Sequence, residues 1–266
     1  MNILFVGDIV GKVGRKALKI NLGNIIEKYK IDFVIANGEN ISRGRGMNEN
    51  HYQFLVNEGV DCVTLGNHYK DRDEIASYID FYDNIVRPAN LNESFPGVGT
   101  QEFDVNGVKI RVTNLLGETY MNVPVVKPYE VLSEIVKNDN SDIHIVDFHA
   151  ETTGEKKAYA YAFCGKISAL LGTHTHVQTA DASILEGETF YISDVGMCGS
   201  STGILGVEKN SVVEKIVLDE PNARFVYLED DDSIFNAVVL KFDAITFKPQ
   251  EIIPLNILKK KGEKDG

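Results

Sequence analysis

Four short clusters of acidic, amide and histidine residues are the part of this sequence best suited to chemistry. The clusters are Gly7-Asp8, Gly38-Glu39-Asn40, Gly66-Asn67-His68, and His149 with Gly172-Thr173-His174-Thr175-His176. Carboxylate and amide oxygens and imidazole nitrogens are ligands for hard or borderline divalent metals. Each cluster follows a short apolar run, so the four can meet only if several strand ends share one rim. This arrangement predicts a two-metal hydrolase that cleaves phosphate esters.

Two histidines separated by one residue, His174 and His176, are spaced to act together. If the backbone stays extended there, side chains two residues apart point to the same side, which brings both imidazoles to one locus. Thr173 would support the backbone around them. His149 ends an apolar run in which His144 faces the opposite side. We therefore assign His149 to the site and His144 to packing or the surface.

The segment after Glu39-Asn40 carries two arginines, Arg43 and Arg45, between glycines. Two guanidinium groups beside an anionic substrate could clamp a phosphate, and the alternative is a solvated loop. The glycines at positions 7, 11 and 14 suggest a dinucleotide-binding fingerprint, but the spacing of the first two is wrong for it. A dinucleotide site would also leave the histidine clusters unexplained.

Composition limits the classes of partner. The chain has 266 residues, 43% of them apolar and 25% charged, which is ordinary for a globular protein with a sizeable core. The net charge of −12 disfavours stable binding to duplex nucleic acid, because that binding rests on Lys and Arg neutralising phosphates. A small phosphate substrate is compatible if bound cations reverse the local field. The three cysteines form no CxxC pair, which disfavours a thiolate zinc site.

Apolar runs and helical periodicity alternate along the first third of the chain. Strands are predicted at 3–6, 33–36 and 62–65, and helices at 14–29, 49–58 and 71–82. Asn106-Gly107 predicts a hairpin that joins 100–104 to 108–116. Later strands are predicted at 143–148, 167–171, 190–193, 224–228, 235–242 and 251–255, and later helices at 127–137 and 151–163. The rhythm predicts a largely parallel sheet, with a second sheet supplied by the second half.

The sequence predicts one domain, because no Pro- or Ser-rich linker divides it. We place this domain at residues 1–258 and a charged, disordered tail at 259–266. The first residues enter a strand pattern without a basic leader, and no run approaches about 20 apolar residues. We therefore expect a cytoplasmic protein with no membrane partner.

With these residues in view, the chain resembles the YmdB-like branch of the calcineurin-like metallophosphoesterase superfamily. The resemblance covers nearly the whole chain in order, and its most specific stretch is Gly-Thr-His-Thr-His-Val-Gln-Thr-Ala-Asp at 172–181. The other shared motifs are Gly7-Asp8-Ile9-Val10-Gly11, Asn37-Gly38-Glu39-Asn40, Thr64-Leu65-Gly66-Asn67-His68, Asn114-Leu115-Leu116-Gly117, Asp147-Phe148-His149-Ala150-Glu151 and Asp194-Val195-Gly196-Met197.

The resemblance implies an α/β fold, a four-layer α/β/β/α sandwich of two mixed sheets, with a dinuclear metal centre. It implies ligand roles for six residues: Asp8 and His176 on the first metal, Asn67, His149 and His174 on the second, and Glu39 bridging both. Asn40 would support the site and the substrate. His68 would face the scissile phosphate without binding metal. Val10 stands where the wider superfamily has a histidine, which leaves the first metal with fewer ligands.

The resemblance also implies the reaction. Phosphodiesters would be hydrolysed, with cyclic nucleotides such as 2′,3′- or 3′,5′-cAMP as the substrate class. Two cations, iron or manganese with zinc as the alternative, would generate a bridging hydroxide that attacks phosphorus. His68 would then act as general acid and protonate the departing alkoxide. A homo-oligomer is implied as well.

Three rival functions share some of these features. A phosphomonoesterase or 5′-nucleotidase would use the same metals. A non-catalytic regulatory protein could keep a metal site for folding or partner binding, although His68 is not needed to hold metal. A dinucleotide-binding oxidoreductase would instead bind NAD. Because the residues favour chemistry at two metals, we expect an enzyme that acts on a small phosphodiester or nucleotide.

Overall fold

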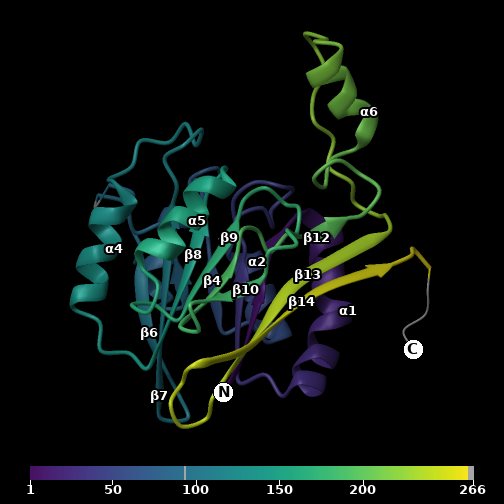
Figure 1. The fold of residues 1–266 in the computed structure, drawn as a ribbon. Helices are drawn as coiled ribbons and strands as arrows, with labels where there is room; N and C mark the ends of the chain where they lie inside the picture. Colours follow the sequence, from purple (N-terminus) through teal and green to yellow (C-terminus); the bar gives the residue numbers. More distant parts are fainter. Residues whose placement is uncertain (93, 263–266) are drawn as a thin grey trace.

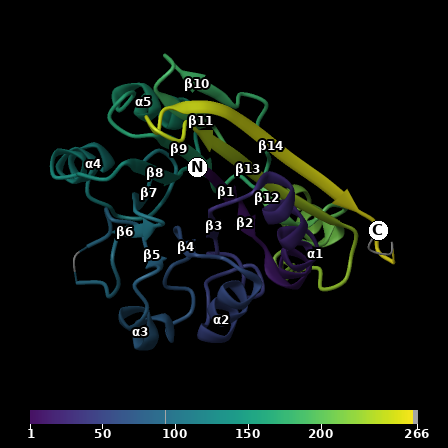
Figure 2. The ribbon, with the colours of Figure 1, turned by 90° about the horizontal axis from the view of Figure 1, so that it is seen from below.

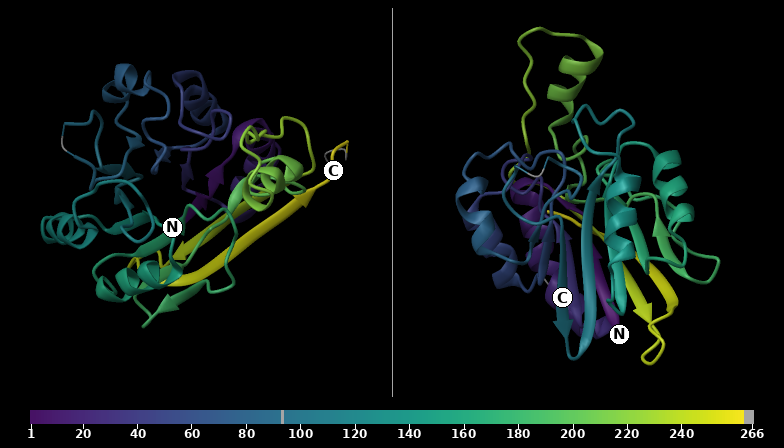
Figure 3. Two further views of the ribbon diagram at one scale, coloured as in Figure 1. Left: turned by 90° about the horizontal axis from the view of Figure 1, so that it is seen from above. Right: turned by 90° about the vertical axis from the view of Figure 1, so that its left-hand side faces the viewer.

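Two β-sheets pack face to face in the computed structural model, which describes residues 1–92 and 94–262, and helices cover the outer faces (Figure 1). Seen edge-on, the helices of the first and the middle parts of the chain lie on opposite sides of the two sheets (Figure 3). This is the predicted four-layer α/β/β/α arrangement, and that prediction is confirmed.

The first sheet has eight strands and holds the N-terminal part of the chain at its centre. Its strands are β1 (Asn2–Val6), β2 (Asp8–Ile9), β3 (Phe33–Asn37), β4 (Cys62–Thr64), β5 (Ile85–Val86), β12 (Met197–Ser200), β13 (Ser233–Phe242) and β14 (Pro249–Lys259). β1, β3, β4 and β5 run parallel to one another. β13 pairs antiparallel with β1, so the sheet is mixed. The long hairpin of β13 and β14 crosses the molecule (Figure 2).

The second sheet has six strands, in the order β10-β11-β9-β8-β7-β6. Its strands are β6 (Thr100–Val105), β7 (Val108–Leu116), β8 (Ile143–His149), β9 (Ala169–Thr173), β10 (Ser183–Leu185) and β11 (Thr189–Ile192). β7, β8, β9 and β11 are parallel neighbours, and the two edge strands are antiparallel. The carboxyl ends of β8 and β9 therefore meet at one rim.

Most of the helices connect parallel strands, and the last one lies between the antiparallel strands β12 and β13. They are α1 (Gly11–Tyr29), α2 (Glu49–Glu58), α3 (Ile75–Tyr78) with a following 3₁₀ turn (Ile79–Phe81), α4 (Pro128–Lys137), α5 (Thr153–Ala162) and α6 (Lys209–Val212) with a following π turn (Val213–Val217). Capping residues set both ends of α2. At its start the Asn48 side chain accepts a hydrogen bond from the His51 N–H, and at its end Gly59 takes a left-handed conformation at φ 104°.

Three hydrophobic clusters correspond to the three boundaries between the four layers. Leu4 and Val6 of β1 face α1 and α2, while Ile3 and Phe5 face the second sheet. The alternation places both faces of the strand in a core, as the continuous apolar run predicts. The third cluster includes Phe148 and packs α4 and α5 against the outer face of the second sheet. The two sheets thus share one core, which fits the proposed single domain over residues 1–258.

Most predicted elements are present, and the boundaries of α2 are those predicted. The helix expected over 71–82 is confined to α3 and its 3₁₀ turn. The strand expected at 224–228 is wrong: Tyr227 makes only an isolated bridge, to Val207. The short strands β2, β5, β10 and β12 and the helical turns at 209–217 were not predicted.

An arm formed by residues 201–232, between β12 and β13, carries α6 away from the rest of the protein (Figure 1). Several of its apolar side chains are exposed, including Ile216 at 67% and Val217 at 71%. Of the tail expected over 259–266, Lys259 ends β14 and Lys261 pairs with Asp230, at 2.7 Å. Residues 263–266 lie outside the described residues. No helix within the described ranges has both the length and the apolar character needed to cross a bilayer.

Candidate metal centre

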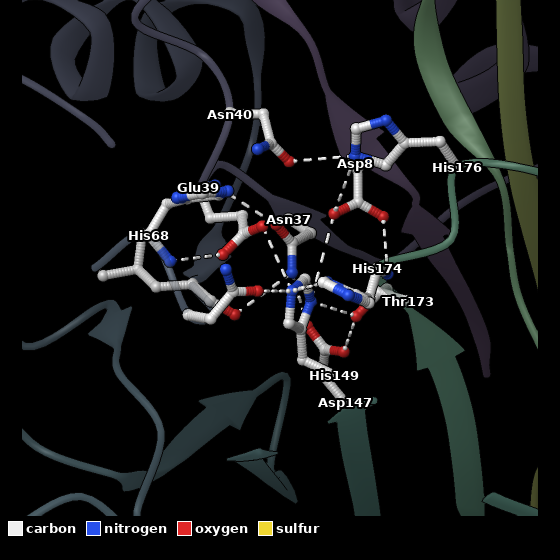
Figure 4. Close-up of polar contacts among 12 residues, drawn as sticks. Asp8, Asn37, Glu39, Asn40, His68, Asp147, His149, Thr173, His174 and His176 are labelled. Carbon is white, nitrogen blue, oxygen red and sulfur yellow. Dashed lines mark hydrogen bonds and ion pairs between the residues drawn. The ribbon is translucent and has the colours of Figure 1, made fainter. Parts of the chain in front are cut away.

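Strand ends from both sheets bring the four sequence clusters together, as Figure 4 shows. Asp8 begins β2 just after β1, Glu39 follows β3, and Asn67 follows β4. His149 is the last residue of β8, and His174 comes directly after β9. The site therefore lies where carboxyl ends of parallel strands in the two sheets face each other.

His149 is at the centre of the first group of candidate ligands. Its Nε2 lies 2.9 Å from Oδ1 of Asn67, 3.0 Å from Nδ1 of His174 and 3.1 Å from Oε1 of Glu39. Ligand atoms of Glu39, His149 and His174 all lie within 4.8 Å of one another. Two imidazoles, a carboxylate and an amide oxygen at one point form a donor set suited to a divalent cation without thiolate.

Asp8 and His176 form a second group beside the first. Asp8 is fully buried, and its Oδ2 accepts a hydrogen bond from the His174 N–H at 3.2 Å. Its other oxygen, Oδ1, makes no hydrogen bond within the described part of the chain, although it lies 3.9 Å from Nε2 of His176. A buried carboxylate oxygen without a partner is costly, and a cation would satisfy it. The Asn40 Oδ1 lies 3.2 Å from the same His176 nitrogen.

Burial and the charges of neighbouring residues shift the pKa values of this cluster. Burial raises the pKa of Asp8 well above its usual value. Burial also raises the pKa of Glu39, but the charge and hydrogen bond of His149 outweigh it and lower the pKa to about 2. Burial lowers the pKa of His149, but Glu39 and Asp8 outweigh it and raise the pKa to about 9. A metal bound at His149 would therefore have to displace a proton from it, because histidine ligates through a neutral nitrogen.

A chain of hydrogen bonds behind His149 fixes the orientation of its imidazole ring. The Thr173 hydroxyl donates to Oδ1 of Asp147 at 2.7 Å, so its oxygen is free to accept from Nδ1–H of His149, which lies 2.8 Å away. That leaves Nε2 directed at the ligand group. Asn37 donates to the other oxygen of Asp147 at 3.0 Å. The support by Thr173 was predicted, but Asp147 and Asn37 were missed; Asp147 could have been found, because it lies two residues before His149 on the same strand face.

The turn that carries the histidine pair is not extended. His174 has φ 100° and His176 has φ 66°, both in the left-handed region. The expectation that extended backbone aligns the two side chains is therefore wrong, although both imidazoles do reach the site. Such backbone conformations cost free energy and are found where surrounding contacts impose them.

Lys156 is one source of those contacts, and sequence reasoning missed it. Its side chain is fully buried, and its Nζ donates to the Thr173 carbonyl at 2.8 Å and to Oδ2 of Asp194 at 2.9 Å. The same Asp194 oxygen accepts from the Thr175 N–H at 2.9 Å. This ion pair therefore holds the backbone on both sides of His174.

His68 lies at the mouth of the site rather than among the central nitrogen and oxygen atoms. Its N–H donates to Oε2 of Glu39 at 3.0 Å, and its Nδ1 lies 2.9 Å from Oδ2 of Asp71. Asp71 was missed by sequence reasoning, although it lies only three residues after His68. With Nδ1 bonded to a carboxylate, Nε2 is the ring atom left for a substrate.

A cavity of about 330 Å³ opens over these groups. Its polar side includes Glu39, Asn40, Arg45, His68 and His176, and its apolar side comes from the arm. The arm residues are Ile204, Leu205, Val207, Val212, Ile216, Phe225 and Tyr227. Arg45 thus lines this cavity. Arg43 lines a neighbouring cavity instead, because it lies in a left-handed turn at φ 55°.

Two mixed sheets with this ligand set at their shared rim define a metallophosphoesterase-like α/β protein. The model of the YmdB-like protein family matches residues 4–255, and the chain belongs to that family. The resemblance described from the sequence is thereby confirmed.

Several known proteins are similar along nearly the whole chain. A 2′,3′-cyclic-nucleotide 2′-phosphodiesterase of Bacillus subtilis is 41% identical over 255 residues, which cover 95% of each chain. A crystal structure of a novel phosphatase from Mycoplasma pneumoniae matches at TM-score 0.92 and 36% identity, covering 98% of this chain and 95% of the other. A hypothetical protein from Thermus thermophilus matches at TM-score 0.90 and 35% identity, over 97% of this chain and 100% of the other. These relatives support the conclusion that the protein is a hydrolase of phosphoric esters, and more specifically a phosphodiesterase.

Proposed function

We propose that this protein is a dinuclear metal-dependent phosphodiesterase of cyclic nucleotides of the 2′,3′- or 3′,5′-cAMP class. The observation that carries the proposal is the convergence of Glu39, Asn67 and His174 on Nε2 of His149, beside the unbonded Oδ1 of Asp8. The activity named for the Bacillus subtilis relative, a 2′,3′-cyclic-nucleotide 2′-phosphodiesterase, supports the same substrate class.

The residues present fit two cations. Asp8 and His176 would hold one ion, Asn67, His149 and His174 the other, and Glu39 would be shared. Oxygen and nitrogen ligands without thiolate favour iron or manganese, with zinc as the alternative. When bound, the cations would lower the pKa of a water molecule and neutralise phosphate charge.

The other residues of the cavity act on the substrate directly. Arg45 presents a cation to the phosphate, and Asn40 presents an amide beside it. His68 gives a proton from Nε2 to the departing oxygen, while Asp71 holds its ring through Nδ1. The apolar residues of the arm offer a surface against which a nucleobase can pack.

The test separates the roles of metal binding and proton transfer. His68→Ala should keep its fold and its metal content but lose turnover of 2′,3′-cAMP by about 100-fold or more. Glu39→Ala should lose both metal and turnover. Metal analysis by mass spectrometry and a phosphodiester assay measure the two effects. A metal-free His68→Ala protein would contradict the assignment of His68.

A phosphomonoesterase is the second candidate, because a similar solved structure is described as a phosphatase. Comparing bis-p-nitrophenyl phosphate with p-nitrophenyl phosphate distinguishes the two activities. Faster hydrolysis of the monoester would replace the phosphodiesterase proposal. Normal metal content without hydrolysis of either compound would favour a non-catalytic regulatory protein.

We also propose that the protein is a homo-oligomer in the cytoplasm. Exposed apolar side chains on the arm, such as Ile216 and Val217, form the kind of surface that subunits cover. Light scattering after size-exclusion chromatography measures the mass directly. A monomeric mass at micromolar concentration would contradict the proposed oligomer. The proposed cytoplasmic location fits a nucleotide substrate.

A further inference from the structure

A second cavity, of about 550 Å³, adjoins the catalytic cavity at segment 42–45. Four basic side chains line it: Lys12, Arg15, Arg43 and Arg72. Among its described lining residues, Glu229 is the single carboxylate. The cluster is unexpected in a chain with a net charge of −12, and the proposed reaction makes no use of it.

Two of these cations are held in place by the segment that separates the cavities. Nη1 of Arg15 donates to the Ile41 carbonyl at 2.6 Å. Arg72 donates from Nη2 to the Ser42 carbonyl at 2.9 Å and from Nε to the Arg45 carbonyl at 3.2 Å. Neither guanidinium lies within ion-pair distance of a carboxylate in the described ranges 1–92 and 94–262, although the charge of Glu229 acts on Arg15, so both cations can still meet a ligand.

The positive field of this cavity acts on a neighbouring group. His51 lines the same cavity, and its Nδ1 lies 2.7 Å from the Ser42 hydroxyl. Burial, together with the charges of Arg15 and Arg72, lowers the pKa of His51 to about 4. The imidazole is therefore neutral near pH 7, and a bound anion would meet a cavity whose charge comes from the arginines and Lys12.

The two cavities are close enough to share walls. Tyr227 lines both of them, and its ring lies so near Gly44 that an added Cβ would collide with it. Arg43 and Arg45 lie on the same short segment but line different cavities. A ligand longer than one nucleotide could therefore place phosphates on both sides of this segment.

We propose that the second cavity is a subsite for an additional phosphate of the substrate, so that the enzyme prefers a short single-stranded oligonucleotide ending in a cyclic phosphate over a mononucleotide. This inference rests on the proposed phosphodiesterase function. Arginine side chains recognise phosphate oxygens through paired hydrogen bonds, and Lys12 adds a further positive charge on a flexible side chain.

The experiment compares kcat/KM for 2′,3′-cAMP with that for a triadenylate ending in a 2′,3′-cyclic phosphate. Wild-type protein should prefer the trinucleotide about tenfold. Lys12→Gln should lower kcat/KM for the trinucleotide about fivefold, weaken the dependence of that value on salt, and leave 2′,3′-cAMP within about twofold. Lys16→Gln is the matched control, because Lys16 lies on the same helix but pairs with Asp230 outside the cavity.

Each alternative outcome has a distinct meaning. Equal effects of Lys12→Gln on both substrates, or none on either, would overturn the subsite. If inorganic phosphate alters 2′,3′-cAMP turnover in the wild type but not in Lys12→Gln, the cavity binds a separate phosphate and the oligonucleotide proposal is wrong. If neither substrate is hydrolysed, the proposed function fails. Fluorescence anisotropy with a labelled triadenylate 3′-phosphate then decides the subsite alone: binding that Lys12→Gln weakens supports it, and equal binding overturns it.

Discussion

Replacing Lys156 by methionine tests how the histidine turn is held. The ammonium group is fully buried and bonds the Thr173 carbonyl at 2.8 Å and Asp194 at 2.9 Å. Methionine keeps an unbranched chain of similar length but removes the charge and both donors. The change leaves the Asp194 carboxylate buried without its cation.

The expected loss follows from the burial of that pair. Removing one partner of a buried ion pair costs about 3–5 kcal/mol, because the remaining charge stays desolvated. In a chain of this size each kcal/mol lowers the melting temperature by about 2–4 °C, so a decrease of roughly 10 °C is expected. Metal affinity should fall as well, because the turn before and after His174 loses its anchor.

Differential scanning calorimetry of metal-free protein measures the loss of stability, and metal titration measures the second effect. Lys157→Met is the matched control, since Lys157 is the next residue of α5 and is exposed. The control should stay within about 0.5 kcal/mol of wild type. A Lys156→Met protein that melts with the control would refute the reasoning that this pair holds the site.

Three further predictions concern single residues. Gly66→Ala should lower metal affinity about 10–100-fold, because the new Cβ would collide with Oε2 of Glu39 and lie 2.6 Å from Nε2 of His149. A metal titration measures the affinity, and an unchanged value would contradict this prediction. Glu39→Gln should lower metal content measured by mass spectrometry, because the amide lacks the negative charge of the proposed bridging carboxylate; full occupancy would argue against a bridging role. Burial raises the pKa of Asp139, but the bonds from His144 and Arg111 outweigh it and lower the pKa below its usual value. The paired carboxylate therefore stabilises the fold above about pH 4, and this stabilisation is lost as the pH falls. Asp139→Asn should lower the free energy of unfolding in urea by about 2 kcal/mol at pH 7 and by much less at pH 2. An equal decrease at both pH values would refute this reasoning.

The sequence was sufficient to predict β1, β3, β4 and β8, which lead to or carry candidate ligands, because these buried strands are mostly apolar. It also predicted that Asp8, Glu39 and His149 would meet, because parallel strands end at a common rim. It could not predict the left-handed turn at His174, which depends on Asp8 and Asp194 from distant segments. The role of Lys156 was also hidden, because a lysine on an amphipathic helix is typical of a solvated face.

The errors in secondary structure have a similar origin. Phe225, Val226 and Tyr227 form an apolar run of residues that favour strands, yet they belong to the arm, and both aromatic residues line the cavity. No local pattern distinguishes a residue that packs on a ligand site from one that packs on a sheet. Arg43 and Arg45 were expected to clamp a phosphate or to form a solvated loop; Arg45 lines the cavity over the candidate ligands, whereas Arg43, in a left-handed turn, lines the second cavity.

The arm leaves the first sheet at the end of β12 and returns at the start of β13, where Ser200 pairs with Ser233. Because its two ends are adjacent, residues can be inserted or deleted within the arm without shifting the register of either strand. Its side chains form the apolar wall of the cavity, whereas the candidate metal ligands come from strand ends elsewhere. Changes within the arm would therefore reshape the apolar wall of the cavity while leaving the candidate metal ligands in place.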